Sequence, residues 1–537
     1  MGRQVENLLA HWMHQLKIPL SSQYVKGKLL AHSDYPSLLS ITDTLDELGI
    51  DNAALVVDKK KLNEIPVPFL AHTAVKGGEF ILVTSLKTLF KEHPDFNKQW
   101  NGVIVAAEKT KQWNNEENKK QLAREKRKRR LVWLSAASII LLSALSLWNQ
   151  SIWQYFGLLI TSLFGLGVAI LIAQHELGIS NELTEQLCAA GKNTDCDAVM
   201  NSKSLKFLNW FNWADAGIIY FSSVFLLLVI SFFTGTTQSF EVLLALLAIC
   251  SLPFTIFSLY YQWRIVKKWC PLCLATVGLL WIQFALFLPV ILSLTKDGFD
   301  LLSINTILIT VFLLALTSTV WLQLIKPSLQ KNTELTDKNF SLLRFKNNPE
   351  VFKVLLQQQR RVDITPFKND LQLGNPNADI QIIVACSPYC GPCAKTHKIL
   401  HELVEKNDIG LTIRFAVKTE NNDDKKLQAV KYILQLLKGK KASFKRKALY
   451  DWYSLMNFEK FTMKYPMPVS VDVDEQLKEQ EKWTKESKVS FTPTVFINGF
   501  EMSKQYRVED LKNLVRRLLP WGTVNKELII ETDYSLV

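Results

Sequence analysis

No cysteine lies before Cys188, although the chain of 537 residues contains eight. This absence excludes thiol catalysis and disulfide bonds from the first third of the chain. Six of the eight cysteines fall into three close pairs, which are Cys188/Cys196, Cys270/Cys273 and Cys390/Cys393. A small scaffold held together by disulfides would spread its cysteines over its whole length. The pairs therefore indicate local thiol or metal chemistry in the middle and C-terminal parts.

Charged residues are missing from six stretches that are each about long enough to span a bilayer. These stretches are 131–148, 152–174, 216–234, 242–262, 271–295 and 303–325. A soluble core helix of this length would carry a charged face. We therefore predict a polytopic helical membrane bundle, and six spans would place both termini and all three cysteine pairs at one membrane face. Residues 1–30 lack a sustained apolar core, so no cleavable signal peptide is expected.

The net charge of +13 comes largely from basic residues beside apolar stretches. The run Arg124–Arg130 directly precedes the first stretch, which favours contact with anionic lipid and predicts no nucleic-acid partner. The positive-inside rule would put the cysteine face, with Arg264, Lys267 and Lys268, in the cytoplasm. Disulfide chemistry favours the oxidising side instead. Both placements stay open, and an interfacial 131–148 would reconcile them.

A redox dithiol stands at the head of the fifth stretch. Cys270 and Cys273 are three positions apart, so they lie on one helical turn and can form or open a disulfide. Pro271 suits the first position of a helix, which places Cys270 where the helix dipole favours a thiolate. We therefore expect a redox-active pair at the membrane boundary.

The loop between the second and third stretches carries another pair. Cys188 and Cys196 enclose Gly191 and Asn193, so they can close a small, easily exchanged disulfide. A zinc site needs four nitrogen or sulfur ligands, and no histidine lies close by in the sequence. No metal is therefore predicted here.

This arrangement resembles the bacterial vitamin K epoxide reductase family over residues 131–325. The resemblance is carried by the loop pair, by a serine six residues after it, and by the membrane dithiol: Cys188, Cys196, Ser202, Cys270 and Cys273. It implies a four-helix core around a quinone such as ubiquinone or menaquinone. The predicted extra span at 131–148 departs from the minimal pattern of that family. It also implies that Cys273 faces the quinone, that Cys270 exchanges with the loop pair, and that Ser202 hydrogen-bonds near the active cysteines.

The third pair lies in a soluble region with a strand-like run at 380–385 and a helix after Cys390-Gly-Pro-Cys393. A second strand follows at 411–417, and Thr492-Pro493 comes much later. This order resembles thioredoxin, and the stretch 424–485 resembles the helical insertion of DsbA-like oxidases. The resemblance implies that Pro493 is cis beside the disulfide and that Thr492 offers its backbone to a substrate.

Chemistry assigns different roles to the two thiols of this pair. Cys390 would lie exposed at a helix N-terminus, where the dipole lowers its pKa and makes it the attacking thiolate. Cys393, one turn further, would resolve the mixed disulfide. Cys250 and Cys386 have no partner in the sequence and are expected to be structural. His397 is expected to pack rather than to carry protons.

Residues 1–110 are expected to form a small α+β domain, with a helix at 37–49 and four short strands. Their order resembles the papain-like peptidase domain of bacteriocin-processing exporters. Glu79 stands where that family has its histidine, and the cysteine is absent, so the domain is expected to be catalytically inactive. His32 and His72 are expected to be structural.

The predicted fold class is multidomain: a helical membrane bundle between a small α+β papain-like domain and an α/β thioredoxin-fold domain with a helical insertion. The expected boundaries are 1–110, a basic connector at 111–130, the membrane domain 131–325, a linker at 326–375 and the thioredoxin-fold domain 376–537.

The predicted function is that of a quinone-dependent thiol oxidase in the bacterial inner membrane, with its cysteine face in the periplasm. Electrons would pass from cysteine pairs of substrate proteins or peptides to Cys390/Cys393, to the loop pair, to the membrane pair and finally to quinone. Gly391-Pro392 is typical of reducing thioredoxins, so the reverse relay is an alternative. A peptide-binding component of a bacteriocin exporter is another, and a metal-trafficking module is the weakest.

Overall fold

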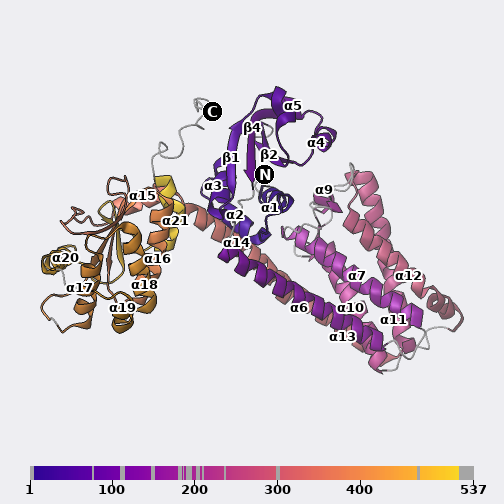
Figure 1. The fold of residues 1–537 in the computed structure, drawn as a ribbon. Coiled ribbons are helices and arrows are strands. Elements are labelled where there is room, and N and C mark those ends of the chain that lie inside the picture. Colours follow the sequence, from indigo (N-terminus) through magenta and orange to yellow (C-terminus); the bar gives the residue numbers. More distant parts are fainter. Residues whose placement is uncertain are drawn as a thin grey trace. The chain divides into compact units, whose positions relative to one another are not determined.

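A computed structural model describes residues 5–518 of the chain. Within that range it leaves out 75–77, 109–114, 147–151, 180–183, 185–186, 189–195, 201–205, 209–210, 235–236, 298–302, 422 and 468–471. The chain divides into two compact units, Lys120–Asn339 and the combination of Met1–Lys119 with Phe340–Val537. We call the first of these the membrane unit and describe each part by itself (Figure 1).

The N-terminal domain packs helices against an antiparallel four-stranded sheet of order β1-β4-β2-β3. Its strands are β1 (Asp51–Val56), β2 (Phe69–Thr73), β3 (Glu79–Val83) and β4 (Trp100–Glu108). Its helices are α1 (Val5–Gln15), α2 (Ser22–Leu30), α3 (Leu38–Leu48), η1 (Lys59–Glu64), α4 (Leu86–Glu92) and α5 (Phe96–Gln99). The Ser37 hydroxyl caps α3, and Gly49 ends it at φ +73°, a left-handed conformation that favours glycine. The predicted small α+β domain is thus confirmed.

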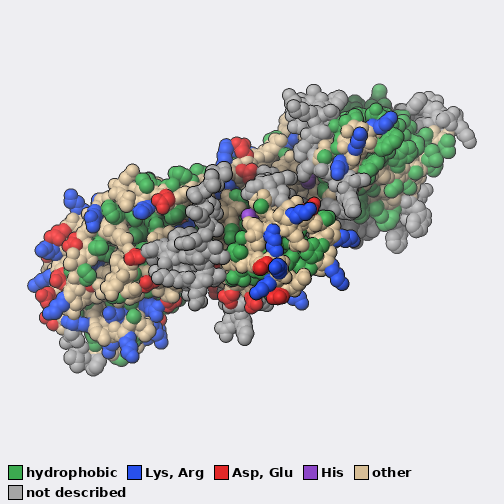
Figure 2. Space-filling model, turned by 90° about the horizontal axis from the view of Figure 1, so that it is seen from above, with side chains coloured by type: hydrophobic (Ala, Val, Ile, Leu, Met, Phe, Trp, Pro, Cys, Tyr) green, Lys and Arg blue, Asp and Glu red, His purple; other side chains and the backbone are tan. Residues whose placement is uncertain are grey.

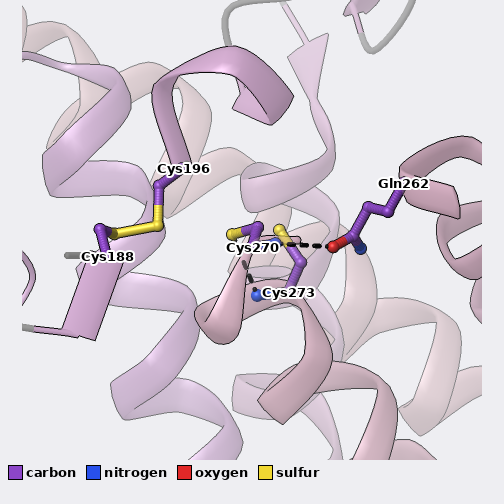
Figure 3. The surroundings of a disulfide bond; sticks show 5 residues. All are labelled: Cys188, Cys196, Gln262, Cys270 and Cys273. Carbon is purple, nitrogen blue, oxygen red and sulfur yellow. Dashed lines mark hydrogen bonds between the residues drawn. A yellow bond between two sulfur atoms is a disulfide. The ribbon is translucent and has the colours of Figure 1, made fainter. Parts of the chain in front are cut away.

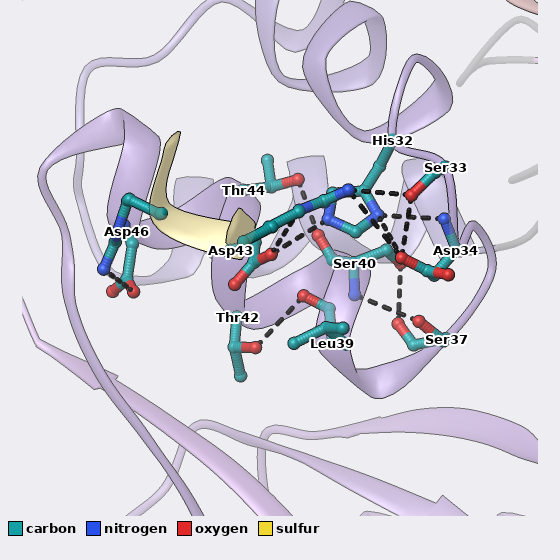
Figure 4. Close-up of polar contacts among 12 residues, drawn as sticks. His32, Ser33, Asp34, Ser37, Leu39, Ser40, Thr42, Asp43, Thr44 and Asp46 are labelled. Carbon is teal, nitrogen blue, oxygen red and sulfur yellow. Dashed lines mark hydrogen bonds and ion pairs between the residues drawn. The ribbon is translucent and has the colours of Figure 1, made fainter. Parts of the chain in front are cut away.

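His32 is held inside this domain by polar contacts (Figure 4). Its Nε2 lies 3.1 Å from Asp43 Oδ2, and its Nδ1 accepts the backbone N–H of Asp34 at 3.2 Å. Burial lowers the pKa of His32 to about 4. A neutral ring with both nitrogens engaged is a structural element, which supports the interpretation made from the sequence.

The membrane unit contains five described helices that are long and apolar enough to cross a membrane. These candidate spans are Gln154–Glu176, Trp213–Ser231, Ser239–Val266, Pro271–Leu292 and Ile304–Lys346. The helices that contain them are α7 (Ile152–Glu176), α10 (Trp213–Thr234), α11 (Thr237–Tyr260) with η5 (Tyr261–Val266), α12 (Pro271–Asp297), and α13 (Ile304–Thr319) with η6 (Val320–Ile325) and α14 (Lys326–Lys346). They overlap the last five predicted stretches, and the fifth span continues to Lys346, 21 residues beyond the predicted end at 325.

Three shorter elements and one long helix are also described in this unit. The short ones are α9 (Cys196–Met200), β5 (Lys206–Leu208) and β6 (Phe211–Asn212). The basic run and the first predicted stretch belong to one continuous helix, α6 (Glu116–Ser146). Whether 131–148 spans stays a prediction, since 147–148 lie outside the described residues.

Apolar side chains both fill the bundle and cover it. Gly165 on α7 allows close approach of α10, because a Cβ there would lie 2.2 Å from a ring carbon of Phe221. Outward-facing side chains include Phe164, 67% exposed, and Leu308, 63% exposed. Figure 2 shows such apolar side chains gathered over these helices. An apolar exterior of this extent matches a lipid environment.

The C-terminal domain contains a five-stranded sheet of order β11-β10-β8-β9-β7, with β8 and β9 parallel and the other pairs antiparallel. Its strands are β7 (Leu371–Gly374), β8 (Gln381–Cys386), β9 (Gly410–Phe415), β10 (Thr494–Ile497) and β11 (Phe500–Glu501). Its helices are α15 (Pro349–Gln357), α16 (Gly391–Lys406), α17 (Lys425–Leu437), α18 (Ala442–Leu455), α19 (Phe458–Lys464), α20 (Asp474–Glu486), η7 (Val508–Asp510) and α21 (Leu511–Leu518). The predicted thioredoxin fold with a helical insertion is confirmed. Strand β7 precedes the expected boundary at 376, and helices α14 and α15 occupy much of the expected linker.

A buried ion pair in this domain makes a first prediction. Arg414 and Asp370, 0% and 1% exposed at their side chains, lie 2.6 Å apart. Asp370→Asn leaves the guanidinium without its counter-charge, so the free energy of unfolding should fall by about 3–5 kcal/mol. Glu405→Gln breaks a solvent-exposed pair with Arg446 and should cost less than about 1 kcal/mol. Urea unfolding of the full chain, followed by pulse proteolysis, compares the two, and equal losses would contradict the prediction.

Candidate functional site

Helix α12 presents the membrane dithiol at its first turn. Pro271 is its first residue, and Cys270 just before it is fully buried. The backbone N–H of Cys273 donates to Cys270 Sγ at 3.3 Å. The backbone N–H of Cys270 donates to the side-chain oxygen of Gln262 at 2.8 Å (Figure 3). Both the side-chain sulfur and the backbone N–H of Cys270 are therefore hydrogen-bonded.

The loop pair lies beside the membrane pair. Cys188 and Cys196 are joined as a disulfide, and Figure 3 shows it next to Cys270 and Cys273. The four cysteines belong to one apolar cluster of the membrane unit. The structure therefore brings together two pairs that are about 80 residues apart in the sequence. Ser202 lies outside the described residues, so its predicted contact is not tested.

A cavity of about 280 Å³ opens beside Cys273. Its wall is formed mainly by apolar residues of α7, α10, α11 and α12, such as Ala169, Phe221 and Leu247. A few polar groups interrupt this lining, namely Glu176, Tyr220, Ser251, Ser258, Tyr261, Gln262 and Thr276. Cys273 lines the cavity and Cys270 is not among its lining residues, so the two thiols have different surroundings. Cys250, expected to be only structural, lines the cavity as well.

The third pair heads helix α16 in the C-terminal domain. Cys390 caps the helix, and its Sγ accepts the backbone N–H of Cys393 at 3.3 Å. The same sulfur lies 3.5 Å from the carbonyl oxygen of Thr492, and the Thr492–Pro493 peptide bond is cis. Burial raises the pKa of Cys393 to about 12. Cys390 is only partly buried, so it is the more accessible of the two thiols.

Two buried groups behind this pair do not behave as catalysts. His397 is 2% exposed and stacks on Tyr453 at 4.3 Å, and neither ring nitrogen has a hydrogen-bond partner among the described residues. Burial lowers its pKa to about 3, so the ring stays neutral at physiological pH. Cys386 is fully buried and lies 3.7 Å from the carbonyl oxygen of Arg414. Both contacts support the structural roles expected from the sequence.

Comparison with known proteins agrees with this geometry. Residues 157–288 match the vitamin K epoxide reductase family, and residues 367–517 match a family described as thioredoxin. The chain therefore carries a vitamin K epoxide reductase domain and a thioredoxin-like domain. Its apolar helices make it a membrane protein, and its two domains make it a thiol–disulfide oxidoreductase. No curated protein matches the chain.

Several solved structures resemble part of the chain. BdbD from Bacillus subtilis is 10% identical, with a TM-score of 0.24, and the match covers 30% of this chain and 96% of that one. α-DsbA1 from Wolbachia pipientis is 16% identical, with a TM-score of 0.24, and covers 29% and 93% of the two chains. DsbA from Chlamydia trachomatis is 15% identical, with a TM-score of 0.23, and covers 30% and 96%.

The polar residues around the cavity beside Cys273 were not predicted from the sequence. Gln262 lies in a π-helical segment that continues α11 and ends at Lys267, which has a left-handed backbone at φ +56°. This irregular turn carries the chain back toward α12, so the contact with Cys270 is not visible in a helical pattern. A glutamine eight residues before the dithiol, in an otherwise apolar span, was the available signal. Glu176 and Tyr220 were missed in the same way.

Buried histidines of the thioredoxin-like domain predict a pH dependence of its stability. Burial lowers the pKa of His397 to about 3 and of His401 to about 4. A histidine has a pKa of about 6.5 in the unfolded chain. The unfolded state therefore binds more protons below pH 6.5, and stability is lost as the pH falls through that value toward 4.

We expect each of the two histidines to contribute a slope of up to about 1.4 kcal/mol per pH unit over this range. His397→Phe keeps the stack on Tyr453 and removes one titrating group. The difference in unfolding free energy between variant and wild type should therefore grow in favour of the variant between pH 7 and pH 5. Urea midpoints of the full chain at these pH values measure it. A constant difference would contradict the assignment.

Proposed function

We propose that the protein is a quinone-dependent thiol oxidase that generates disulfides in proteins or peptides with paired cysteines. One observation carries the proposal: Cys273 opens onto an apolar cavity, while Cys270 lies on the side of the loop disulfide. A dithiol placed in this way can exchange with a protein disulfide through one sulfur and meet an apolar oxidant at the other.

The proposed relay consists of thiol–disulfide exchanges. A substrate thiolate attacks the Cys390–Cys393 disulfide at Cys390, and the substrate's second thiol releases the oxidised product. The reduced pair then reduces Cys188–Cys196, and that pair reduces Cys270–Cys273. Each exchange breaks one S–S bond and forms another, and moves two electrons. The covalent tether between the domains raises the effective concentration of one partner for the other.

The residues around the cavity fit a quinone headgroup. Such a ring is flat and mainly apolar and carries two oxygen atoms, and the cavity offers apolar walls with hydroxyl and amide groups of Tyr220, Ser251 and Gln262. When bound, a quinone accepts two electrons and two protons, and its high potential relative to protein dithiols favours oxidation of Cys270 and Cys273. Ubiquinone or menaquinone would meet these requirements.

The proposed location is the bacterial inner membrane, with the cysteine face toward the periplasm, where disulfides persist. The Gly-Pro between Cys390 and Cys393 favours a second candidate, the same relay running as a reductase. One measurement distinguishes them: whether the oxidised chain converts substrate thiols to disulfides, or the chain reduced by quinol converts substrate disulfides to thiols.

Quinone dependence provides the test of the proposal. Without oxygen or quinone, the purified oxidised chain should oxidise at most three equivalents of a dithiol peptide, one for each cysteine pair. Addition of a soluble ubiquinone analogue should restore many turnovers. Continued turnover without quinone, or none with it, would contradict the proposed function.

A further inference from the structure

A second cavity of the membrane unit lies against the first. It measures about 480 Å³ and is polar in character, with Asn212, Asp215, Lys326 and Gln330 among its lining residues. Glu176, the last residue of α7, lines this polar cavity and also the apolar cavity beside Cys273. Glu176 is therefore a residue that the linings of both cavities share.

Hydrogen bonds connect Glu176 to the interior of the polar cavity. The side-chain amide of Asn212 donates to Glu176 Oε2 at 3.2 Å, and the backbone N–H of Asn212 donates to Asp215 at 2.8 Å. Asp215 is 1% exposed and forms an ion pair with Lys326 at 2.5 Å. The indole N–H of Trp321 also donates to Asp215 at 2.8 Å. This network connects Glu176, through Asn212, to the buried ion pair that lines the polar cavity.

The chemistry at Cys273 requires a route for protons. Closing the Cys270–Cys273 disulfide breaks two S–H bonds, and reducing a quinone forms two O–H bonds. The apolar walls of the first cavity offer few groups that can move a proton. Among its described lining residues Glu176 is the one carboxylate. A carboxylate beside the reacting atoms can accept a proton and pass it on.

We propose that Glu176 carries protons between the polar cavity and the reacting atoms beside Cys273, an inference that rests on the proposed function. As the two thiols oxidise, two electrons pass to the quinone and two protons leave sulfur. Glu176 accepts each of them in turn and releases it into the polar cavity, and it returns two protons from that cavity to the reacting quinone, one for each oxygen that is reduced. It ends in the protonation state in which it began, so thiol protons lost equal oxygen protons gained.

The test compares three variants of the full chain in lipid nanodiscs. Glu176→Gln keeps a hydrogen-bond acceptor for Asn212 but carries no proton, and Glu176→Asp keeps the carboxylate. Glu241→Gln is the matched control, because Glu241 accepts a hydrogen bond from Tyr155 at 2.7 Å and is not among the residues that line either cavity. Each reduced protein is mixed with a soluble ubiquinone analogue, and quinone absorbance is followed in H₂O and in D₂O.

General acid–base groups contribute about 10²–10⁴-fold to rates, so Glu176→Gln should slow quinol formation at least about 100-fold. Glu176→Asp and Glu241→Gln should stay within about tenfold of wild type by the same comparison. The solvent isotope effect should be larger in Glu176→Gln than in wild type. Two readouts need no turnover: the dissociation constant of the analogue, measured by equilibrium dialysis, and the rate at which dithiothreitol reopens Cys270–Cys273. Both should be unchanged.

The outcomes separate the inference from the proposed function. If the wild-type protein forms no quinol, both the proposed function and the inference on Glu176 are contradicted. Quinol formation at equal rates in wild type and Glu176→Gln would overturn the inference and leave the oxidase intact. A slower reaction of Glu176→Gln, together with a dissociation constant for the analogue that is raised by the same factor, would also overturn the inference. Glu176 would then bind the quinone rather than carry protons. Equal defects in Glu176→Gln and Glu176→Asp would do the same.

Discussion

Cys273→Ala is expected to abolish quinone reduction by the reduced protein, to the background rate of a variant without any of the three pairs. The reason is stoichiometric as well as geometric. Cys273 lines the apolar cavity, and its sulfur is one of the two that must form the disulfide when two electrons leave. Without it, Cys270 has no partner within the helix, and the reduced loop pair has no Cys270–Cys273 disulfide to which it can pass electrons. Quinone absorbance after anaerobic mixing measures the loss.

Cys250→Ala supplies the matched control for this experiment. Cys250 also lines the cavity but lies on α11, so its removal changes the wall and leaves the dithiol intact. A general loss of cavity shape would slow both variants, whereas loss of the electron donor slows only Cys273→Ala. A normal rate in Cys273→Ala, or an equal defect in Cys250→Ala, would refute the assigned role.

Cys390→Ser is expected to stop oxidation of a dithiol peptide while leaving quinone reduction by the membrane pair intact. Cys390 caps α16 and is the accessible thiol of its pair, whereas Cys393 is fully buried with its pKa raised by burial to about 12. A substrate thiolate therefore has one sulfur to attack. Serine keeps a cap for the helix but cannot form a disulfide, so the block should be chemical rather than structural.

Cys386→Ala controls for the removal of a thiol from the same region. Cys386 ends β8 four residues before Cys390, and it is buried away from solvent. Its loss should reduce stability modestly, as for a small core truncation, and should leave peptide oxidation near the wild-type rate. Peptide oxidation that persists in Cys390→Ser would show that substrates bypass the thioredoxin-like domain.

Local patterns in the sequence predicted the three pairs, the helices that carry two of them and five candidate spans. These features depend on residues close together in the chain: a proline after Cys270, a Gly-Pro between Cys390 and Cys393, and long charge-free runs. The cis Pro493 beside the third pair was reached through a family resemblance, because about 100 residues separate it from Cys390. Spacing alone could not have supplied it.

The polar side of the membrane site could not be predicted in the same way. Gln262 reaches Cys270 through a π-helical turn and a left-handed residue, neither of which has a periodic signature. Glu176 matters because two cavities meet at it, and a cavity is a property of several helices packed together. In the sequence it is one acidic residue at the end of an apolar run, where a solvated helix end is the simpler interpretation.

The most direct test of the whole account is the quinol yield of a single reaction. The fully reduced chain is mixed anaerobically with excess ubiquinone analogue, and quinol is counted while mass spectrometry follows each cysteine pair. The proposed relay predicts three quinols per chain, with Cys270/Cys273 oxidised first and Cys390/Cys393 last. No quinol, together with reduction of an oxidised Cys390–Cys393 by added quinol, would contradict it and establish the reverse relay.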